Sequence, residues 1–223
     1  MDHSRATRAA RFAALGDPAR LAIVEALAHT DLTPGELARH TGLSTNLLAH
    51  HLRQLEDSGL IARQASEGDG RRRYVTLLTE RLPSLVAPPS GGGSVGFVCT
   101  HNSARSQFAA ARYHQLTGLP AVSAGTRPAS RVHPLATVAA RRYDIDLAGG
   151  TPADYSTLPP LDLVVTVCDR ALEEGLPQHR RHLHWSVPDP ARFDRVSEFV
   201  SAFERIDQRL MRLIDPATAV GRS

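Results

Sequence analysis

The sequence predicts an α/β protein in two parts. The first is a mostly helical domain that ends in a β-hairpin, and the second is built on a parallel β-sheet. Helix-period segments fill residues 1–86, whereas short apolar strand-like segments alternate with helical ones over residues 95–214. Between them, residues 87–94 are rich in Pro, Gly and Ser, which is typical of a linker. Residues 215–223 are expected to form a tail.

The bulk composition is that of an ordinary globular protein, with 42% hydrophobic and 22% charged residues among 223. The sequence has no signal peptide and no apolar run of about 18 residues, so we expect a cytoplasmic protein without membrane contact. Two cysteines are too few for a disulfide framework. A net charge of +3 is too small to indicate nucleic-acid binding by itself.

The N-terminal part begins with two predicted helices. Residues 6–15 form the first, and Phe12 and Leu15 are expected to face inward. Asp17 and Pro18 are typical of the N-cap and first position of the second helix.

Two further helices follow, separated by a glycine turn. Thr33 and Glu36 have the spacing of a capping box, which opens a short helix. Gly42 supplies the turn and Ser44 is expected to cap the next helix. This order is the helix-turn-helix arrangement, whose second helix reads DNA. The residues expected to contact DNA from this helix are Ser44, Thr45, Asn46, His50, Arg53 and Gln54.

Two strand-like segments, residues 60–63 and 71–77, flank the turn residues 66–70 and predict a β-hairpin. Such a hairpin is a wing beside a helix-turn-helix, and its arginines are expected to contact DNA phosphates. The arginines concerned are Arg71, Arg72 and Arg73.

Residues 14–21 and 43–61 resemble the ArsR-type winged-helix repressors. The resemblance implies operator DNA as a partner and a homodimer. The alternative is a winged helix that serves only dimerisation or contact with another protein. Arsenic-sensing members bind arsenite through cysteines within the winged helix, but no cysteine precedes Cys99 here. We expect no metal site in this part of the chain.

The segment from Val95 to Gln107 combines an apolar strand, a short loop and a helix. Such a loop directs backbone N–H groups toward one point at the positive end of a helix, which suits a tetrahedral oxyanion. The same field would lower the pKa of Cys99 and make it nucleophilic. Arg105 could hold two oxygens in a fork, and Ser106 could donate to the thiolate. The remaining residues of this oxyanion-binding loop are Thr100, His101, Asn102, Ser103 and Ala104.

Strands and helices alternate through the C-terminal part, which predicts a parallel sheet. The expected strands are residues 95–98, 120–124, 162–167 and about 183–185. The expected helices are residues 104–117, 131–143, a short stretch after Asp169, and 196–213. Sites gather at the carboxyl ends of parallel strands, so Cys99 and Cys168 should open on the same rim. The alternative for Cys168 is a buried small hydrophobic side chain.

The loop resembles that of the low-molecular-weight protein-tyrosine phosphatases and of the arsenate reductases that share their fold. Residues 122–126, 163–169 and 184–191 also agree with this family. The resemblance implies that Asp189 is the general acid and that Cys168 is the reductases' second cysteine. For Asp189 the alternative is a turn carboxylate that precedes a proline.

Two positions favour a reductase over a phosphatase. Gln107 follows Arg-Ser where phosphatases more often have Pro, and Ala191 follows Asp-Pro where they usually have an aromatic residue. Arsenate would then be reduced to arsenite after attack by Cys99, with no bound cofactor and with an external thiol as reductant.

The chain departs from the thioredoxin-coupled reductases, which carry a further cysteine where Gly175 and Leu176 stand. Either Cys168 closes a disulfide with Cys99, or a small thiol attacks the arsenate adduct. The candidate reductants are mycothiol with mycoredoxin, glutathione and thioredoxin. Mycothiol is our first choice because all 26 cationic residues are arginine, which indicates a high-GC source.

Three functions remain open on the sequence. We favour a bifunctional arsenic-resistance protein, in which a DNA-binding regulator is fused to an arsenate reductase. The second is a non-catalytic regulator that senses arsenic or redox state through Cys99 and Cys168. The third is a low-molecular-weight protein-tyrosine phosphatase.

Overall fold

A computed structural model of the 223-residue chain describes residues 3–78, 93–176 and 181–214. The chain divides into two compact units. One comprises residues 1–66 and 70–87, and the other comprises residues 67–69 and 88–223. Most of the predicted linker, residues 87–92, and the predicted tail, residues 215–223, lie outside the described residues.

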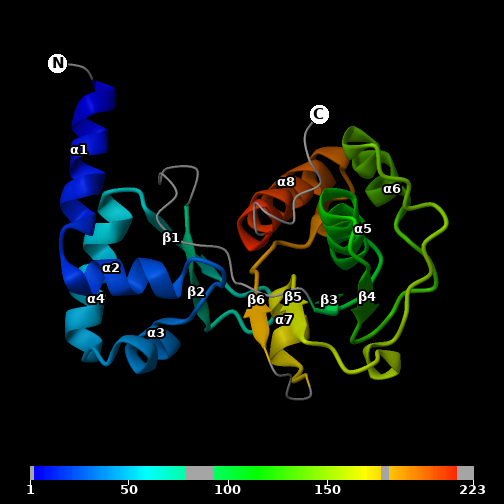
Figure 1. The fold of residues 1–223 in the computed structure, drawn as a ribbon, viewed down its shortest axis with the longest axis horizontal. Helices are drawn as coiled ribbons and strands as arrows, with labels where there is room; N and C mark the ends of the chain where they lie inside the picture. Colours follow the sequence, from blue (N-terminus) through cyan, green and yellow to red (C-terminus); the bar gives the residue numbers. More distant parts are fainter. Residues whose placement is uncertain (1–2, 79–92, 177–180, 215–223) are drawn as a thin grey trace. The chain divides into compact units, whose positions relative to one another are not determined.

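The N-terminal unit contains helices and a two-stranded antiparallel hairpin (Figure 1). The helices are α1 (His3–Leu15), α2 (Pro18–Ala26), α3 (Pro34–Thr41) and α4 (Thr45–Asp57). The strands are β1 (Ile61–Ala65) and β2 (Arg73–Leu77). This order confirms the predicted helix-turn-helix followed by a hairpin.

Local signals set the helix ends. The Asp17 carboxylate accepts hydrogen bonds from the first turn of α2, and Thr33 and Glu36 make both bonds of the capping box at α3. Gly42 ends α3 with φ +70°, in the left-handed region that favours glycine. Ser44 lies at the N-cap of α4, but its side chain makes no capping hydrogen bond, contrary to our expectation.

The inward faces of α2, α3 and α4 form the core of this unit, together with Val75 and Leu77 of the hairpin. The prediction for Phe12 was wrong, because its side chain is 62% exposed. Ala14 of the same helix is buried, and residues two apart lie on nearly opposite sides of a helix. The short apolar pattern of α1 was compatible with either face.

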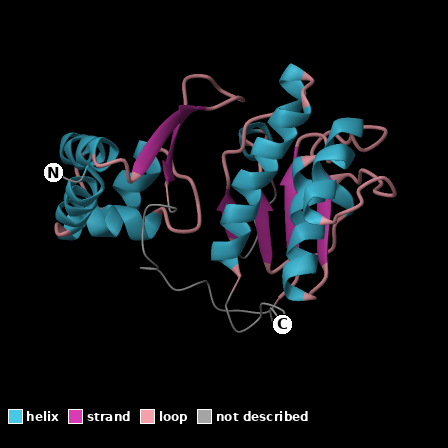
Figure 2. Ribbon diagram, turned by 90° about the horizontal axis from the view of Figure 1, so that it is seen from above, coloured by secondary structure: helices cyan, strands magenta, loops and turns pink. Residues whose placement is uncertain are grey.

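The C-terminal unit is a four-stranded parallel sheet with strand order β4-β3-β5-β6. Figure 2 shows the strands side by side with helices packed along them. The strands are β3 (Val95–Cys99), β4 (Ala121–Gly125), β5 (Leu163–Thr166) and β6 (His182–His184). The helices are α5 (Arg105–Thr117), α6 (Pro134–Ala140), α7 (Asp169–Glu173) and α8 (Val196–Leu213). Short 3-10 turns are η2 (Arg141–Tyr143), η3 (Tyr155–Thr157) and η4 (Pro190–Phe193).

These elements confirm the predicted parallel sheet, with strand ends shifted by one residue and one larger shift at a helix. The helix expected over residues 131–143 begins only at Pro134, because His133 is its N-cap, and ends in the η2 turn. The long helix α8 packs against α5 and α6, as expected from its apolar stripe. Phe203 of α8 stacks on Phe108 of α5 with ring centroids 4.1 Å apart.

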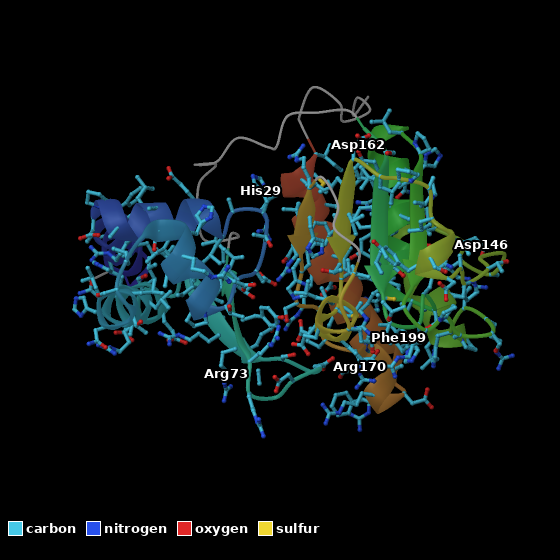
Figure 3. All side chains as sticks on the ribbon, turned by 90° about the horizontal axis from the view of Figure 1, so that it is seen from below. His29, Arg73, Asp146, Asp162, Arg170 and Phe199 are labelled. Carbon is cyan, nitrogen blue, oxygen red and sulfur yellow. The ribbon has the colours of Figure 1, made fainter. Side chains whose placement is uncertain are left out.

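The central strands β3 and β5 are buried along their whole length, which leaves their ends as the places where side chains reach solvent. Asp162 and Arg170 lie at opposite ends of β5 in Figure 3. Cys99 is the last residue of β3, and Cys168 follows β5 by two residues. Both cysteines therefore lie at the carboxyl edge of the sheet, where Arg170 also lies.

Candidate active site

Cys99 lies at the base of a loop that connects β3 to α5. Its sulfur is 3.0 Å from the Ser106 hydroxyl oxygen and accepts a hydrogen bond from the backbone N–H of Asn102 at 3.1 Å. Cys99 is only 2% exposed. Two polar partners, a backbone N–H and a hydroxyl, therefore converge on one buried sulfur.

The carbonyl groups of this loop point outward into hydrogen bonds with residues 126–133. The four bonds run from Thr126 N to Cys99 O, Arg127 N to Thr100 O, Ala129 N to His101 O and His133 N to Ser103 O. With its carbonyls engaged outside, the loop can turn N–H groups inward. Ala104, the N-cap residue of α5, makes no side-chain capping bond, so the first turn of α5 can offer its N–H groups to an anion.

Asn102 shapes the loop from within. It adopts φ +48° and is fully buried, and asparagine is among the few residues besides glycine that enter this region. Its side-chain amide donates to the Ser106 oxygen at 2.8 Å. Because that oxygen accepts from Asn102, the Ser106 hydroxyl proton can point at Cys99. The Asn102 oxygen in turn accepts from Ala153 N at 2.9 Å and from the Gln107 amide at 3.2 Å.

The side chain of Asn102 thus points away from the anion position, and only its backbone N–H serves the loop. Sequence reasoning placed Asn102 in the loop but missed this supporting role, and it missed that Gln107 is part of the support. The signal available was an asparagine in a tight loop, which favours positive φ.

Gly125 at the end of β4 was also missed as a site residue. A Cβ there would lie 2.6 Å from Thr100 O and 2.9 Å from Asn102 N, both backbone atoms of the loop. In the β3–β4 register Gly125 lies opposite Cys99, so only a residue without a side chain lets the loop close here.

Arg105 and Asp189 face each other across the loop. One guanidinium nitrogen of Arg105 is 3.1 Å from the Asp189 carboxylate, and another donates to Val187 O at 2.7 Å. Burial acts to lower the pKa of Arg105, but the neighbouring Cys168, Asp189 and Cys99 outweigh it and raise the pKa. Arg105 is therefore a fixed cation within reach of a bound oxyanion.

Cys168 lies on the same rim as the Cys99 loop. Its sulfur is 3.4 Å from the Thr100 hydroxyl, and Thr100 is the residue that follows Cys99. Burial raises the pKa of the Cys168 thiol, although the Arg105 guanidinium acts in the opposite direction. Cys168 is therefore a protonated thiol at neutral pH.

A pocket opens on this rim, and its walls include Thr100, His101, Arg105, Cys168 and Asp189. His101 is exposed and Ser103 is half-buried, so these two loop side chains lie nearer to solvent than Cys99 does.

Within the described residues, no group of three or more His, Cys, Asp or Glu side chains is placed to hold a metal ion. No described helix is both long and apolar enough to cross a membrane.

In the N-terminal unit, most of the residues expected to contact DNA from α4 are exposed. The exposed ones are Ser44, Thr45, Asn46, His50 and Arg53. Gln54 is half-buried, and its side-chain oxygen accepts a hydrogen bond from Arg20 while its amide nitrogen lies 3.2 Å from the His50 ring. Gln54 therefore links Arg20 of α2 to His50 within the helix-turn-helix.

The three hairpin arginines also lie at the surface. Arg71, Arg72 and Arg73 are all exposed, and Figure 3 shows Arg73 where the hairpin strand begins. Exposed guanidinium groups on a hairpin can pair with phosphates.

Each half of the chain matches a known protein family. Residues 94–222 match the family described as low molecular weight phosphotyrosine protein phosphatase, and residues 17–63 match the bacterial regulatory proteins of the arsR family. An arsenate reductase of Bacillus cereus is 36% identical over 125 residues, which cover 53% of this chain and 92% of the relative. Arsenate reductase 2 of Staphylococcus saprophyticus is 34% identical over 128 residues, covering 55% and 96%.

A solved structure described as an arsenate reductase in the phosphate binding state is similar in both sequence and fold. It is 25% identical with a TM-score of 0.50, and the match covers 55% of this chain and 96% of that one. The chain therefore belongs to the low molecular weight phosphotyrosine protein phosphatase family, and it joins an arsenate reductase-like domain of that fold to an ArsR-type helix-turn-helix segment.

Proposed function

We propose that the chain is a bifunctional arsenic-resistance protein, a DNA-binding transcriptional regulator fused to an arsenate reductase. The observation that carries the reductase half is the buried Cys99 sulfur, which lies in an anion-binding loop with a second thiol, Cys168, on the same rim. A hydrolytic phosphatase needs the first thiol but has no use for the second.

The reaction begins with arsenate in the loop. The N–H groups of the loop and the Arg105 fork hold its oxygens and the negative charge that builds on them. Cys99 attacks the arsenic atom, forming a sulfur–arsenic bond while one oxygen leaves as water. Ser106 stabilises the thiolate before the attack through the 3.0 Å contact.

Asp189 is the proton donor to the leaving oxygen. Its carboxylate pairs with Arg105 at 3.1 Å. A bound oxyanion would compete with Asp189 for the same guanidinium, which places the carboxylate beside the leaving oxygen.

The second thiol completes the reduction. Cys168 attacks the Cys99 sulfur, a disulfide forms and the sulfur–arsenic bond breaks. The electron pair of that bond stays on arsenic, which leaves as arsenite, and the Cys168 proton passes to an arsenite oxygen. The alternative is attack by a small external thiol, which would form a mixed disulfide with Cys99.

Regeneration of the two thiols requires an external reductant rather than a bound cofactor. The candidates are mycothiol with mycoredoxin, glutathione and thioredoxin, and we place mycothiol first. Since Gly175 and Leu176 occupy the positions of a third cysteine, a protein thiol cascade would stop at Cys168.

The N-terminal unit would bind operator DNA as a homodimer, with α4 in the major groove and the hairpin arginines on phosphates. The exposed residues of α4 support this role. No cysteine precedes Cys99, so a thiophilic ion would have to act on this unit without thiols of its own.

A tyrosine phosphatase is the second candidate, because the family to which the chain belongs is described by that activity. The same loop and acid would hydrolyse a phosphate ester without Cys168. A sensor that binds arsenic through Cys99 and Cys168 without turnover is the third.

Steady-state assays separate these functions. Purified protein is offered arsenate with each of the three reductants in turn, and p-nitrophenyl phosphate in a parallel assay. We expect arsenate turnover that disappears in Cys99→Ser, and little hydrolysis of the phosphate ester. Efficient ester hydrolysis without arsenate reduction would establish the phosphatase, and failure of both reactions in protein that binds DNA would establish the sensor.

A further inference from the structure

A buried hydrogen-bonded group beside Cys168 takes no part in the steps above. It consists of Thr166, Asp169 and His184, which are 0%, 4% and 4% exposed. The His184 Nε2 atom is 3.1 Å from the Asp169 carboxylate, and its Nδ1 atom is 2.9 Å from the Thr166 hydroxyl. Buried polar groups that pair so completely hold their surroundings in one arrangement.

The direction of the bond between His184 and Asp169 follows from the Asp169 carboxylate. Burial acts to raise the pKa of Asp169, but hydrogen bonds from His184 and Ser186 outweigh it, so the pKa is lowered. An ionised carboxylate only accepts hydrogen bonds, so His184 Nε2 carries the proton. On its other side the ring lies with Nδ1 2.9 Å from the Thr166 hydroxyl, which also donates to Leu183 O at 3.3 Å.

The positions of the two partners along the chain give this group its significance. Thr166 is the last residue of β5, and Asp169 is the first residue of α7. Cys168 lies between them as the N-cap of α7, and its own side chain makes no capping bond. His184 lies opposite Thr166 in the β5–β6 register. Its ring therefore contacts Thr166 before Cys168 and Asp169 after it.

We propose that His184 is a positioning residue, which acts through Thr166 and Asp169 to hold the Cys168 sulfur against the Cys99 loop. This inference rests on the proposed reductase function and assigns its second step to Cys168 rather than to an external thiol. The position that His184 fixes is the one in which Cys168 lies 3.4 Å from the Thr100 hydroxyl. From there Cys168 attacks Cys99, as in the disulfide step above.

Two substitutions at His184 test the proposal. His184→Leu removes both hydrogen bonds and leaves the Asp169 carboxylate without its histidine partner, so the start of α7 should move. His184→Gln keeps a side-chain N–H near the position of Nε2 and should keep Asp169 in place. His114→Leu is the matched control, because His114 is an exposed histidine on α5 whose ring Nδ1 lies 3.0 Å from Leu119 O.

The assay mixes reduced protein with arsenate, without external thiol, and follows formation of the Cys99–Cys168 disulfide by mass spectrometry of quenched samples. Alkylation of Cys99 by iodoacetamide reports on the loop itself. His184→Leu should slow disulfide formation by about tenfold or more, because misplacement of a reacting group by about 1 Å is costly. Cys99 alkylation should stay at the wild-type rate, and His184→Gln should restore disulfide formation to within about threefold.

A parallel series replaces arsenate by hydrogen peroxide, which oxidises Cys99 to a sulfenic acid that Cys168 converts to the disulfide with release of water. The same loss in His184→Leu is expected, so the positioning is tested even if arsenate proves not to be the substrate. Wild-type disulfide rates in His184→Leu, an equal loss of Cys99 alkylation, or no Cys99–Cys168 disulfide with either oxidant would overturn the inference. Arsenite release by external thiol alone would overturn it too, while leaving the reductase function intact.

Discussion

Gly125→Ala adds a single methyl group, yet we expect it to disrupt the active-site loop strongly. The added Cβ would lie 2.6 Å from Thr100 O, and moving that carbonyl to an ordinary contact of 3.4 Å displaces it by about 0.8 Å. The Asn102 nitrogen, 2.9 Å from the same Cβ, has to move as well. That nitrogen donates to Cys99 at 3.1 Å, so the bond to the nucleophile lengthens or breaks.

The expected loss follows from the size of the shift. A displacement of about 1 Å in a group that holds the reacting atoms costs about 10²-fold in rate. We therefore expect kcat/KM for arsenate to fall by about 10²-fold, equivalent to about 2.7 kcal/mol of transition-state stabilisation. Cys99 alkylation by iodoacetamide should slow in the same variant, because the thiolate loses an N–H donor.

Gly149→Ala is the control, since a Cβ at Gly149 meets nothing within 4 Å. It should leave both kcat/KM and Cys99 alkylation at wild-type values. If Gly125→Ala kept kcat/KM within about threefold of wild type, the loop geometry described above would not limit catalysis, and the reasoning would be wrong.

Three further predictions concern charge and protonation. Hydrogen bonds from the α2 N-terminus lower the pKa of Asp17 below its ordinary value of 3.8, so its charge stabilises the fold above that pH and not below the folded pKa. Asp17→Asn keeps the cap, so its urea midpoint should be lower than wild type at pH 7, and the difference should shrink as the pH falls below 3.8; a difference that does not change with pH would contradict this. Because the pKa of Cys168 is raised, its alkylation in native protein should still be increasing with pH above 9.0, and a plateau below that pH would refute the assignment. Arg72→Gln should reduce the salt dependence of DNA binding by about 0.9 in the log–log slope, measured by fluorescence anisotropy, and an unchanged slope would remove Arg72 from the phosphate contacts.

Local sequence signals were enough to predict most of the fold. Capping residues, glycine turns and apolar periodicity act within a few neighbouring residues, so α2, α3 and α8 could be read directly. The order of the sheet strands could not, because register depends on contacts between distant segments. On α1 the prediction held for Leu15, which packs against the core, and failed for Phe12, since a short helix packed on one side offers more than one apolar stripe.

The same distinction applies to the site. Cys99, Arg105 and Ser106 stand within eight consecutive residues that run from the end of β3 to the start of α5, so the sequence alone places them together. Gly125 and His184 are important only because they lie opposite Cys99 and Thr166 in the sheet. No local sequence pattern identifies a residue that becomes a neighbour only across the sheet. The histidine that precedes Trp185 therefore gave no reason to connect it with Cys168.

The most direct test of the account is a single turnover without external thiol. Reduced protein is mixed with excess arsenate, and arsenite and remaining free thiols are measured per chain in wild type and in Cys99→Ser. We expect one arsenite and the loss of both thiols per chain in the wild type, and no arsenite in Cys99→Ser. Absence of arsenite from the wild type, with both thiols still free, would contradict the proposal that Cys99 and Cys168 supply the two electrons.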